Sequence, residues 1–310
     1  MSTTPKPRPA EPVFEPGLFD HLLRPGNTNC AGCGMSLSQK WLEEGMGGTP
    51  ITLCIPACCG IVTAGAWPTS AYGVPTVATT FGCVSAVASG LRAVQLMNGD
   101  PGETICWAGD GGTYDIGMAS LSAAAERNED IIYFCYDNEI YGNTGGQRSS
   151  ATPQGAVTST TPFGKPEGKK DIMAIMAAHR IPYAATLSLA HREDYLRKMR
   201  VARRIRGFRF FLIHSPCPTG WKSDPADSVE LVRLAVSSGL FPLYEVFDGR
   251  RYRINAQPDG TPLVAYLERQ GRFRKSDLDP EAARRAVRES WDALSRMEAA
   301  FPAAESDPLD

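Results

Sequence analysis

Four continuous apolar runs constrain the fold of this chain more than any other feature of its sequence. They occupy residues 51–55, 104–109, 131–137 and 208–215. Amphipathic, helix-like stretches lie among them at 85–97, 116–127, 171–179 and 191–206. Strands that are apolar throughout are buried on both faces, and helical crossovers between such strands give a parallel sheet. The sequence therefore predicts a doubly wound α/β fold, with a mostly parallel sheet covered by helices on both faces.

The two ends of the chain differ from this central pattern. Residues 1–24 begin with a proline-rich stretch that contains no apolar run, which predicts an extended arm rather than a signal peptide or a membrane span. We expect a folded domain over 25–226. Residues 227–310 are expected to form a C-terminal extension that packs on the core or on a partner. In this extension, helical segments flank a loop-rich stretch at 244–262.

Charge and cysteine content limit the classes of function. The 32 Lys and Arg residues nearly balance the 34 Asp and Glu residues, so no basic field for nucleic acid and no polybasic membrane anchor is expected. The default location is the cytoplasm. Nine cysteines in a reducing compartment are more often metal ligands or buried apolar residues than disulfides.

Polar residues follow two of the predicted strands. Gly109-Asp110-Gly111-Gly112 comes after the second run, and Asn138 follows the third, 28 positions beyond Asp110. One helix and one strand fit in that interval, so both side chains reach the same sheet edge, where such folds bind ligands. Glycines let backbone N–H groups approach a phosphate, and Asp110, the Asn138 amide and the Ile140 carbonyl suit Mg²⁺. Taken singly, each motif is also compatible with an ordinary turn.

Five cysteines stand on predicted loops. Cys30 and Cys33 form a C-x-x-C motif, Cys58 and Cys59 follow the first strand, and Cys217 lies between two prolines after the fourth. A lone C-x-x-C motif is compatible with zinc, a redox pair or an iron–sulfur cluster, whereas four thiolates from three loops suit a cubane cluster. The other four cysteines lie in or beside apolar runs and are expected to be buried and inert: Cys54, Cys83, Cys106 and Cys135.

Beyond these motifs, the stretch GDGGTYDIGMASLSAAAERNEDIIYFCYDNEIYGNTGGQRSSATP resembles the thiamine-diphosphate-binding (beta) subunit of the multisubunit pyruvate:ferredoxin and 2-oxoacid:acceptor oxidoreductases. The resemblance continues through KKDIMAIMAAHRIPYAAT, HSPCPTGW and SSGLFPLYEVFDG, and covers residues 25 to about 275. It implies that Asp110, Asn138 and the Ile140 carbonyl hold Mg²⁺, and that Asn143 reaches the thiazolium ring and the substrate. It further implies a diphosphate loop shaped by Gly109, Gly111, Gly112, Tyr114 and Asp115.

The resemblance also implies one [4Fe-4S] cluster, with Cys30, Cys33 and Cys217 as three of its ligands. Family members show T-G-C at the remaining ligand, whereas this chain reads A-C-C. Spacing back to Cys33 favours Cys58, and spacing forward to residues 74–75 favours Cys59, which we prefer.

The implied activity is thiamine-dependent oxidative decarboxylation of a 2-oxoacid to an acyl-coenzyme A, with electrons leaving through the cluster to an iron–sulfur protein or NAD. Pyruvate is the leading substrate. An aromatic 2-oxoacid such as phenylglyoxylate, a non-redox thiamine-dependent decarboxylase and a zinc-stabilised scaffold are the alternatives. The expected partners are an alpha-type subunit that completes the thiamine site, a gamma-type subunit and a ferredoxin-like subunit or ferredoxin.

Two sets of basic residues follow the cofactor loop. Arg148 is a candidate ligand for a substrate carboxylate, because a guanidinium group can bind a carboxylate through two hydrogen bonds. Lys165, Lys169 and Lys170 form a basic loop that either binds a coenzyme A phosphate or, as we favour, is simply solvated.

Overall fold

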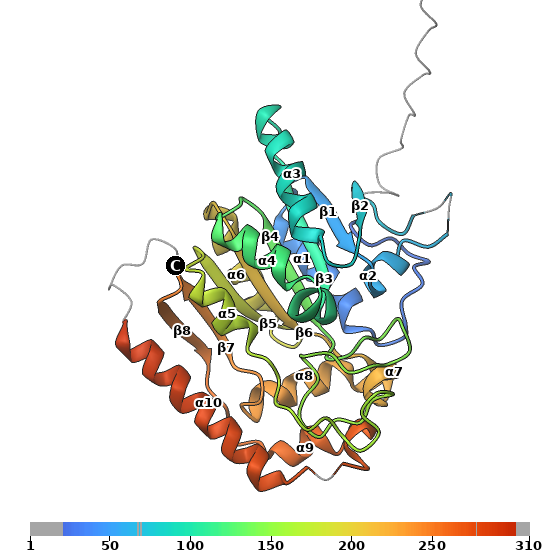
Figure 1. Ribbon diagram of the computed structural model, residues 1–310, viewed down its shortest axis with the longest axis vertical. Helices are drawn as coiled ribbons and strands as arrows, with labels where there is room; N and C mark the ends of the chain where they lie inside the picture. Colours follow the sequence, from blue (N-terminus) through green and yellow to red (C-terminus); the bar gives the residue numbers. More distant parts are fainter. Residues whose placement is uncertain (1–20, 67, 69, 277, 302–310) are drawn as a thin grey trace, which may run out of the picture.

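A single sheet runs through the part of the chain that the computed structural model describes, residues 21–66, 68, 70–276 and 278–301 (Figure 1). The predicted arm at 1–24 lies outside the described residues except for its last four. The strands of the sheet are β1 (Ile51–Pro56), β2 (Thr76–Thr79), β3 (Glu103–Gly109), β4 (Ile132–Asp137), β5 (Tyr183–Ser188), β6 (Arg209–His214), β7 (Leu243–Phe247) and β8 (Arg251–Ala256).

The strand order is β2-β1-β3-β4-β6-β5-β7-β8. The first six strands in this order are parallel, whereas β7 pairs antiparallel with β5, and β8 pairs antiparallel with β7. The predicted apolar runs form β1, β3, β4 and β6, and the last three of these are buried along their whole length. The predicted mostly parallel sheet is therefore confirmed.

Helices cover both faces of the sheet. The helical segments are α1 (Gly34–Met46), α2 (Cys59–Val62), α3 (Val84–Met97), α4 (Met118–Glu126), α5 (Ile172–Ala178), α6 (Arg192–Arg204), α7 (Pro218–Trp221), α8 (Ser228–Ser237), α9 (Leu263–Leu267) and α10 (Pro280–Ala300). A π-helical turn, η1 (Gly111–Asp115), precedes α4, and two short 3₁₀ turns are η2 (Pro225–Asp227) and η3 (Gly271–Phe273). The four predicted helical stretches correspond to α3, α4, α5 and α6.

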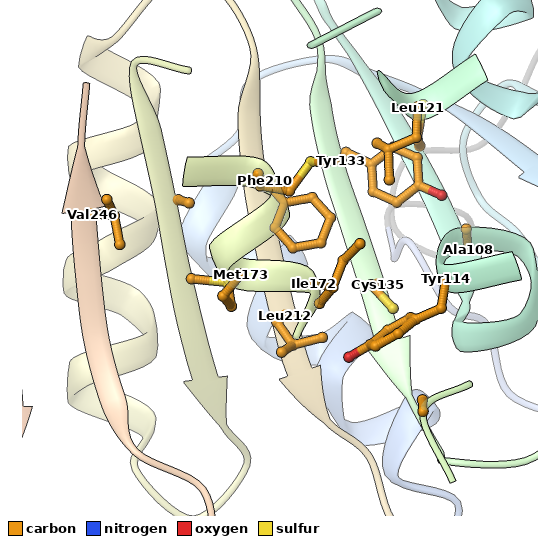
Figure 2. Packing of buried hydrophobic residues seen from close by; sticks show 14 of the residues in the cluster. Ala108, Tyr114, Leu121, Tyr133, Cys135, Ile172, Met173, Phe210, Leu212 and Val246 are labelled. Atoms are coloured by element: carbon orange, nitrogen blue, oxygen red, sulfur yellow. The ribbon is translucent and has the colours of Figure 1, made fainter. Parts of the chain in front are cut away.

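The alternation of side chains along the strands divides the core into two clusters. Residues of α3, α4 and α5 pack on one face of the sheet, and residues of α1 and α6 pack on the other. Figure 2 shows the first face, where Ile172 and Met173 of α5 lie over Phe210 and Leu212 of β6. Because both faces are covered, the edge formed by the ends of the parallel strands is the natural place for a ligand.

The stretch at 244–262 corrects one sequence expectation. Most of it is not loop, because β7 and β8 form a hairpin that extends the sheet. Alternation along these strands is masked by arginines whose side chains stack on an aromatic ring: Arg251 and Arg253 both lie over Phe247. Helix α10 then packs along β8, the edge strand (Figure 1), where Glu298 accepts a hydrogen bond from the Ile254 N–H. The three-part division of the chain stays a prediction.

None of the helices in the described residues combines the length and apolar character needed to span a membrane.

Candidate active site

The predicted site residues gather at the carboxyl ends of four neighbouring parallel strands. Cys58 and Cys59 follow β1, Asp110 follows β3, Asn138 follows β4 and Cys217 lies shortly after β6. The C-x-x-C loop before α1 comes to the same edge, since the Gly34 N–H donates to the Pro216 carbonyl at 3.0 Å. The fold thus brings together segments that are up to 187 positions apart in the sequence.

Three oxygen atoms converge between β3 and β4. The side-chain oxygen of Asn138 faces two other acceptors, the Ile140 carbonyl at 2.8 Å and Asp110 Oδ1 at 2.7 Å. Oxygens so close repel one another unless the amide turns to donate its N–H groups to both, or a cation lies among them. An octahedral Mg²⁺ with ligands at about 2.1 Å holds neighbouring oxygens about 3 Å apart, so this donor set fits the ion.

The surroundings of Asp110 also suit a cation. Its side chain is 1% exposed, and it accepts a hydrogen bond from the Ser149 hydroxyl. Burial, followed by the nearby charge of Asp137, raises the pKa of Asp110 well above its ordinary range. A positive ion beside the carboxylate would reverse that shift by stabilising the charged form.

Glycines next to Asp110 are required by close packing. A Cβ atom on Gly111 would lie 2.1 Å from the ring of Tyr141, and one on Gly117 would lie 1.9 Å from the Gly112 carbonyl. The glycines of η1 line a small pocket of about 130 Å³, together with Gly109, Asp110 and Asn138. Backbone N–H groups at the start of a helical turn can bind a diphosphate there.

Two predicted loop residues act through other contacts. The Tyr114 hydroxyl donates to Asp137 Oδ2 at 2.8 Å, and its ring lies on the sheet near Cys135 (Figure 2). Asp115 accepts from the Tyr141 hydroxyl at 2.7 Å and from the Ser150 hydroxyl, which ties the loop after β4 to η1. Both side chains therefore brace the loop, and only their backbone is left to meet a diphosphate.

Four of the five loop cysteines share a second, larger pocket. This pocket has a volume of about 590 Å³, and its lining includes Cys30, Cys33, Cys59 and Cys217. Burial, followed by the nearness of Cys217 and the other thiols, raises the pKa of Cys59 to about 12. Among the described residues, no three His, Cys, Asp or Glu side chains converge tightly enough for a single metal ion. A cubane, which spreads its thiolates over four irons, needs wider spacing than one zinc ion does.

Cys58 is absent from the lining of that pocket. Its thiol is hydrogen-bonded to the Tyr136 side chain and lies within 3.4 Å of a Cβ built on Gly60. It lines the smaller pocket beside Gly109 instead. The geometry thus favours Cys59 over Cys58 as the partner of Cys217.

The two pockets meet at the loop after β4. Gly142 and Asn143 line both of them, and a Cβ on Gly142 would lie 3.7 Å from Cys59 Sγ, 3.8 Å from Cys217 Sγ and 3.8 Å from Asn138 Nδ2. Asn143, which the resemblance implies would reach the thiazolium ring, is exposed at this junction. Arg148 is also exposed, but it is absent from the lining of either pocket.

The basic loop has a different role from either sequence expectation. Lys169 Nζ lies 2.6 Å from Asp137 Oδ2 and 2.8 Å from Glu139 Oε1, beneath the three converging oxygens. Lys165 is 2% exposed and donates to the carbonyls of Thr152 and Gly168. The expectation that this loop is solvated is therefore wrong, because the ammonium groups of Lys165 and Lys169 bind buried carboxylates and backbone carbonyls.

Sequence reasoning missed the acidic partners of this loop. Glu139 is paired with Lys169 and, at 2.6 Å, with Arg272 from η3. Burial alone would raise the pKa of Glu139, but Lys169 and Arg272 outweigh it and lower the pKa to about 2. The position of Glu139 directly after Asn138 could have indicated that Glu139 belongs to the site. Nothing near Arg272 in the sequence indicates the same for Arg272.

The other cysteines match the sequence expectation with one exception. Cys54, Cys106 and Cys135 are buried in the sheet. Cys83 is exposed, contrary to expectation, because it caps the start of α3 rather than continuing an apolar strand.

Comparison with known proteins identifies the family of this chain. The family model of the thiamine pyrophosphate enzyme C-terminal TPP-binding domain matches residues 58–214, which span β3, β4 and both of the turns described above. A solved structure of 2-oxoglutarate:ferredoxin oxidoreductase from Magnetococcus marinus shares the fold, with a TM-score of 0.60 at 22% identity over 85% of this chain and 93% of that one.

Two groups of relatives align along most of the chain. The ketoisovalerate oxidoreductase subunit VorB of Pyrococcus horikoshii is 41% identical over 298 residues, covering 91% of this chain and 95% of the relative. The pyruvate synthase subunit PorB of Methanothermobacter marburgensis is 42% identical over 262 residues, covering 82% of this chain and 90% of the relative. The chain therefore belongs to the thiamine pyrophosphate enzymes and, within them, to the beta-type subunits of 2-oxoacid:ferredoxin oxidoreductases.

Proposed function

We propose that the chain binds Mg²⁺ and thiamine diphosphate at Asp110, Asn138 and Ile140, and a [4Fe-4S] cluster at Cys30, Cys33, Cys59 and Cys217. The enzyme it belongs to oxidatively decarboxylates a 2-oxoacid to an acyl-coenzyme A. The observation that carries this proposal is the junction at Gly142 and Asn143, where the pocket beside three converging oxygens meets the pocket lined by four cysteines.

Each group of residues has a distinct task at the cofactor. Thiamine diphosphate, when bound, supplies carbanion chemistry at the 2-oxo carbon. Asp110, Asn138 and the Ile140 carbonyl would hold the ion that anchors its diphosphate, and the glycines of η1 give backbone N–H groups access to that diphosphate. Asn143, exposed where the two pockets meet, would orient the substrate.

The cysteine pocket distinguishes this activity from that of a non-redox thiamine decarboxylase. Such an enzyme has no use for thiols gathered beside the cofactor. The sulfurs of Cys59 and Cys217 both lie close to Gly142, so a cluster held by them would lie beside the cofactor pocket and could accept electrons from the reacting centre.

The substrate is a 2-oxoacid, and pyruvate is the one that the sequence favours. The similarity to VorB adds 2-ketoisovalerate as a second candidate, and phenylglyoxylate remains an aromatic alternative. Arg148 is proposed to meet the substrate carboxylate. It can do so only if a partner chain or loop closure brings the carboxylate to it, because it lies outside the lining of both pockets.

The remaining parts of the enzyme are proposed to come from other chains in the cytoplasm. An alpha-type subunit would supply the carboxylate that activates the aminopyrimidine ring. A gamma-type subunit would complete the assembly, and a ferredoxin-like subunit or ferredoxin would take the electrons.

The test is to purify the complex anaerobically with its partner chains and assay it with coenzyme A and each 2-oxoacid in turn. The preferred substrate should reduce an added ferredoxin and should bleach the brown colour of the cluster when no acceptor is present. Decarboxylation without reduction of any acceptor would support the non-redox alternative, and zinc in place of iron would contradict the cluster.

The adjacent cysteines offer a matched pair of variants. Cys59→Ser should lose the iron and the acceptor reduction, whereas Cys58→Ser should keep both, because the Cys58 thiol points toward Tyr136. Iron analysis and electron paramagnetic resonance measure the difference. Loss of iron in Cys58→Ser with retention in Cys59→Ser would reverse the assignment.

A further inference from the structure

Two side chains from outside the sheet hold the turn that carries the converging oxygens. Trp221 Nε1 donates to the Asn138 carbonyl at 2.8 Å, and Arg272 donates to Glu139 Oε2 at 2.6 Å. Trp221 and Arg272 are both almost fully buried, at 0% and 2% exposure. Neither belongs to residues 110–140, which supply the oxygens.

This turn has a backbone that needs external support. Glu139 has a φ of +61°, in the left-handed region that residues other than glycine rarely adopt. It stands between Asn138 and Ile140, so its conformation decides whether the amide oxygen of one and the carbonyl of the other face the same point. The Thr152 hydroxyl donates to the Glu139 carbonyl at 2.7 Å, Lys169 binds the Glu139 carboxylate, and the Glu139 N–H donates to Asp137 Oδ1 at 3.2 Å.

Trp221 also connects this turn to the cysteine pocket. Its backbone N–H donates to the Cys217 carbonyl at 2.7 Å, within the short helix α7 that follows Cys217. The Arg272 guanidinium stacks on the indole ring, 4.1 Å from its centroid, and donates through Nε to Gln270 at 2.8 Å. The two stacked side chains therefore contact the oxygen-bearing turn, and the backbone of Trp221 joins them to the loop that carries Cys217.

We propose that Trp221 and Arg272 are positioning residues, which fix the Asn138 and Ile140 oxygens for Mg²⁺ and tie that turn to the Cys217 loop. This inference rests on the proposed function. It goes further by coupling the two sites: loosening the stack weakens Mg²⁺ binding and alters the surroundings of the cluster together. Residues that orient metal ligands commonly change metal affinity by about 10- to 100-fold when replaced.

The first test removes the indole N–H and keeps an aromatic ring. In the complex purified anaerobically with its partner chains and stripped of Mg²⁺, Trp221→Phe should raise the Mg²⁺ concentration needed for half-maximal thiamine diphosphate binding by roughly 10-fold. Calorimetry measures this binding. The matched control is Trp291→Phe, which also loses an indole N–H bonded to a backbone carbonyl, that of Gly239 at 2.7 Å, but on α10. The control should behave as wild type.

The second test removes the guanidinium group. Arg272→Met should raise the Mg²⁺ requirement by roughly 10- to 100-fold and change the electron paramagnetic resonance spectrum of the reduced cluster. Arg272→Lys should recover part of the affinity, because it keeps a charge beside Glu139 but loses the planar stack on Trp221. Arg269→Met is the control, since Arg269 is more exposed and pairs with Asp227 at 3.3 Å.

The outcomes separate this inference from the proposed function. If wild type binds no Mg²⁺ and thiamine diphosphate or carries no cluster, the proposed function fails and this inference fails with it. If wild type has both, but Trp221→Phe and Arg272→Met keep its Mg²⁺ requirement and its spectrum, only the positioning role is overturned. Equal losses in a variant and its control would also overturn it, because they would reflect general destabilisation.

Discussion

Two clusters of charged side chains lie at opposite ends of the same strands, and they are built differently. At the amino ends of β3, β4 and β6, Arg92, Arg206 and Arg209 are paired with Glu103 and Asp130. Three cations thus meet two carboxylates within ion-pairing distance. Such a cluster has no place for a further cation, and it holds the ends of the strands together.

At the carboxyl ends, acids outnumber bases. Asp110, Asp137 and Glu139 are set against Lys169 and Arg272, which both bind Glu139, while Lys169 also reaches Asp137. Asp110 instead lies 2.7 Å from the Asn138 side-chain oxygen, and its pKa is raised. A deficit of positive charge, together with converging oxygens, therefore marks the functional end of this sheet.

We expect the largest effect from replacing Asp110, the acid at the carboxyl ends of the strands that lies beside the Asn138 side-chain oxygen. Asp110→Asn should reduce Mg²⁺-dependent thiamine diphosphate binding by about 100-fold or more, since it removes a ligand oxygen from the ion. The unfolding midpoint without Mg²⁺ should stay the same or rise, because a buried carboxylate with a raised pKa is lost. Calorimetry and thermal unfolding measure the two quantities. A large fall in the midpoint would mean that Asp110 is structural.

The second change breaks the charged cluster at the amino ends of the strands. Arg209→Met should lower the free energy of unfolding by about 3–5 kcal/mol, because it leaves Glu103 and Asp130 short of a buried partner. The Mg²⁺ requirement of the folded protein should not change. Chemical denaturation and calorimetry check this, and a shift in the Mg²⁺ requirement would show that the two ends are not independent.

The smallest effect concerns acid stability. Burial tends to raise the pKa of Asp130, but the hydrogen bond from Arg92 and the charge of Arg209 outweigh it and lower the pKa below 3.8. A lowered pKa of this kind stabilises the fold above about pH 3.8, and that stabilisation is lost as the pH falls further. Asp130→Asn should therefore flatten the pH dependence of the unfolding free energy below that point. An unchanged slope would mean that other acids account for it.

The buried strands and the oxygen-bearing turns were predictable from the sequence. Continuous apolar runs fixed β1, β3, β4 and β6, and the ends of β3 and β4 placed Asp110 and Asn138 at one edge. Local spacing was sufficient here, because one crossover helix separates the two strands. The preference for Cys59 over Cys58, made from spacing, stays a prediction; Cys59 lines the pocket of Cys217, whereas Cys58 is hydrogen-bonded to Tyr136.

Contacts between distant segments were not predictable. Arg272 reaches Glu139 across 133 positions, and no local pattern distinguishes it from the arginines around it. Lys169 looked like part of a solvated loop, since burial of an ammonium group depends on carboxylates that only the fold brings near. The β7–β8 hairpin was hidden because its arginines cover an aromatic ring and break the apolar alternation.

The most direct test of the central claim is a measurement of proximity between the two sites. Mn²⁺ would replace Mg²⁺ in the anaerobic complex, and its electron spin relaxation would be measured with the cluster oxidised and then reduced. Because the two pockets share Gly142 and Asn143, reduction of the cluster should accelerate the relaxation of Mn²⁺. Relaxation that is identical in both states, with ion and cluster both present, would contradict the account.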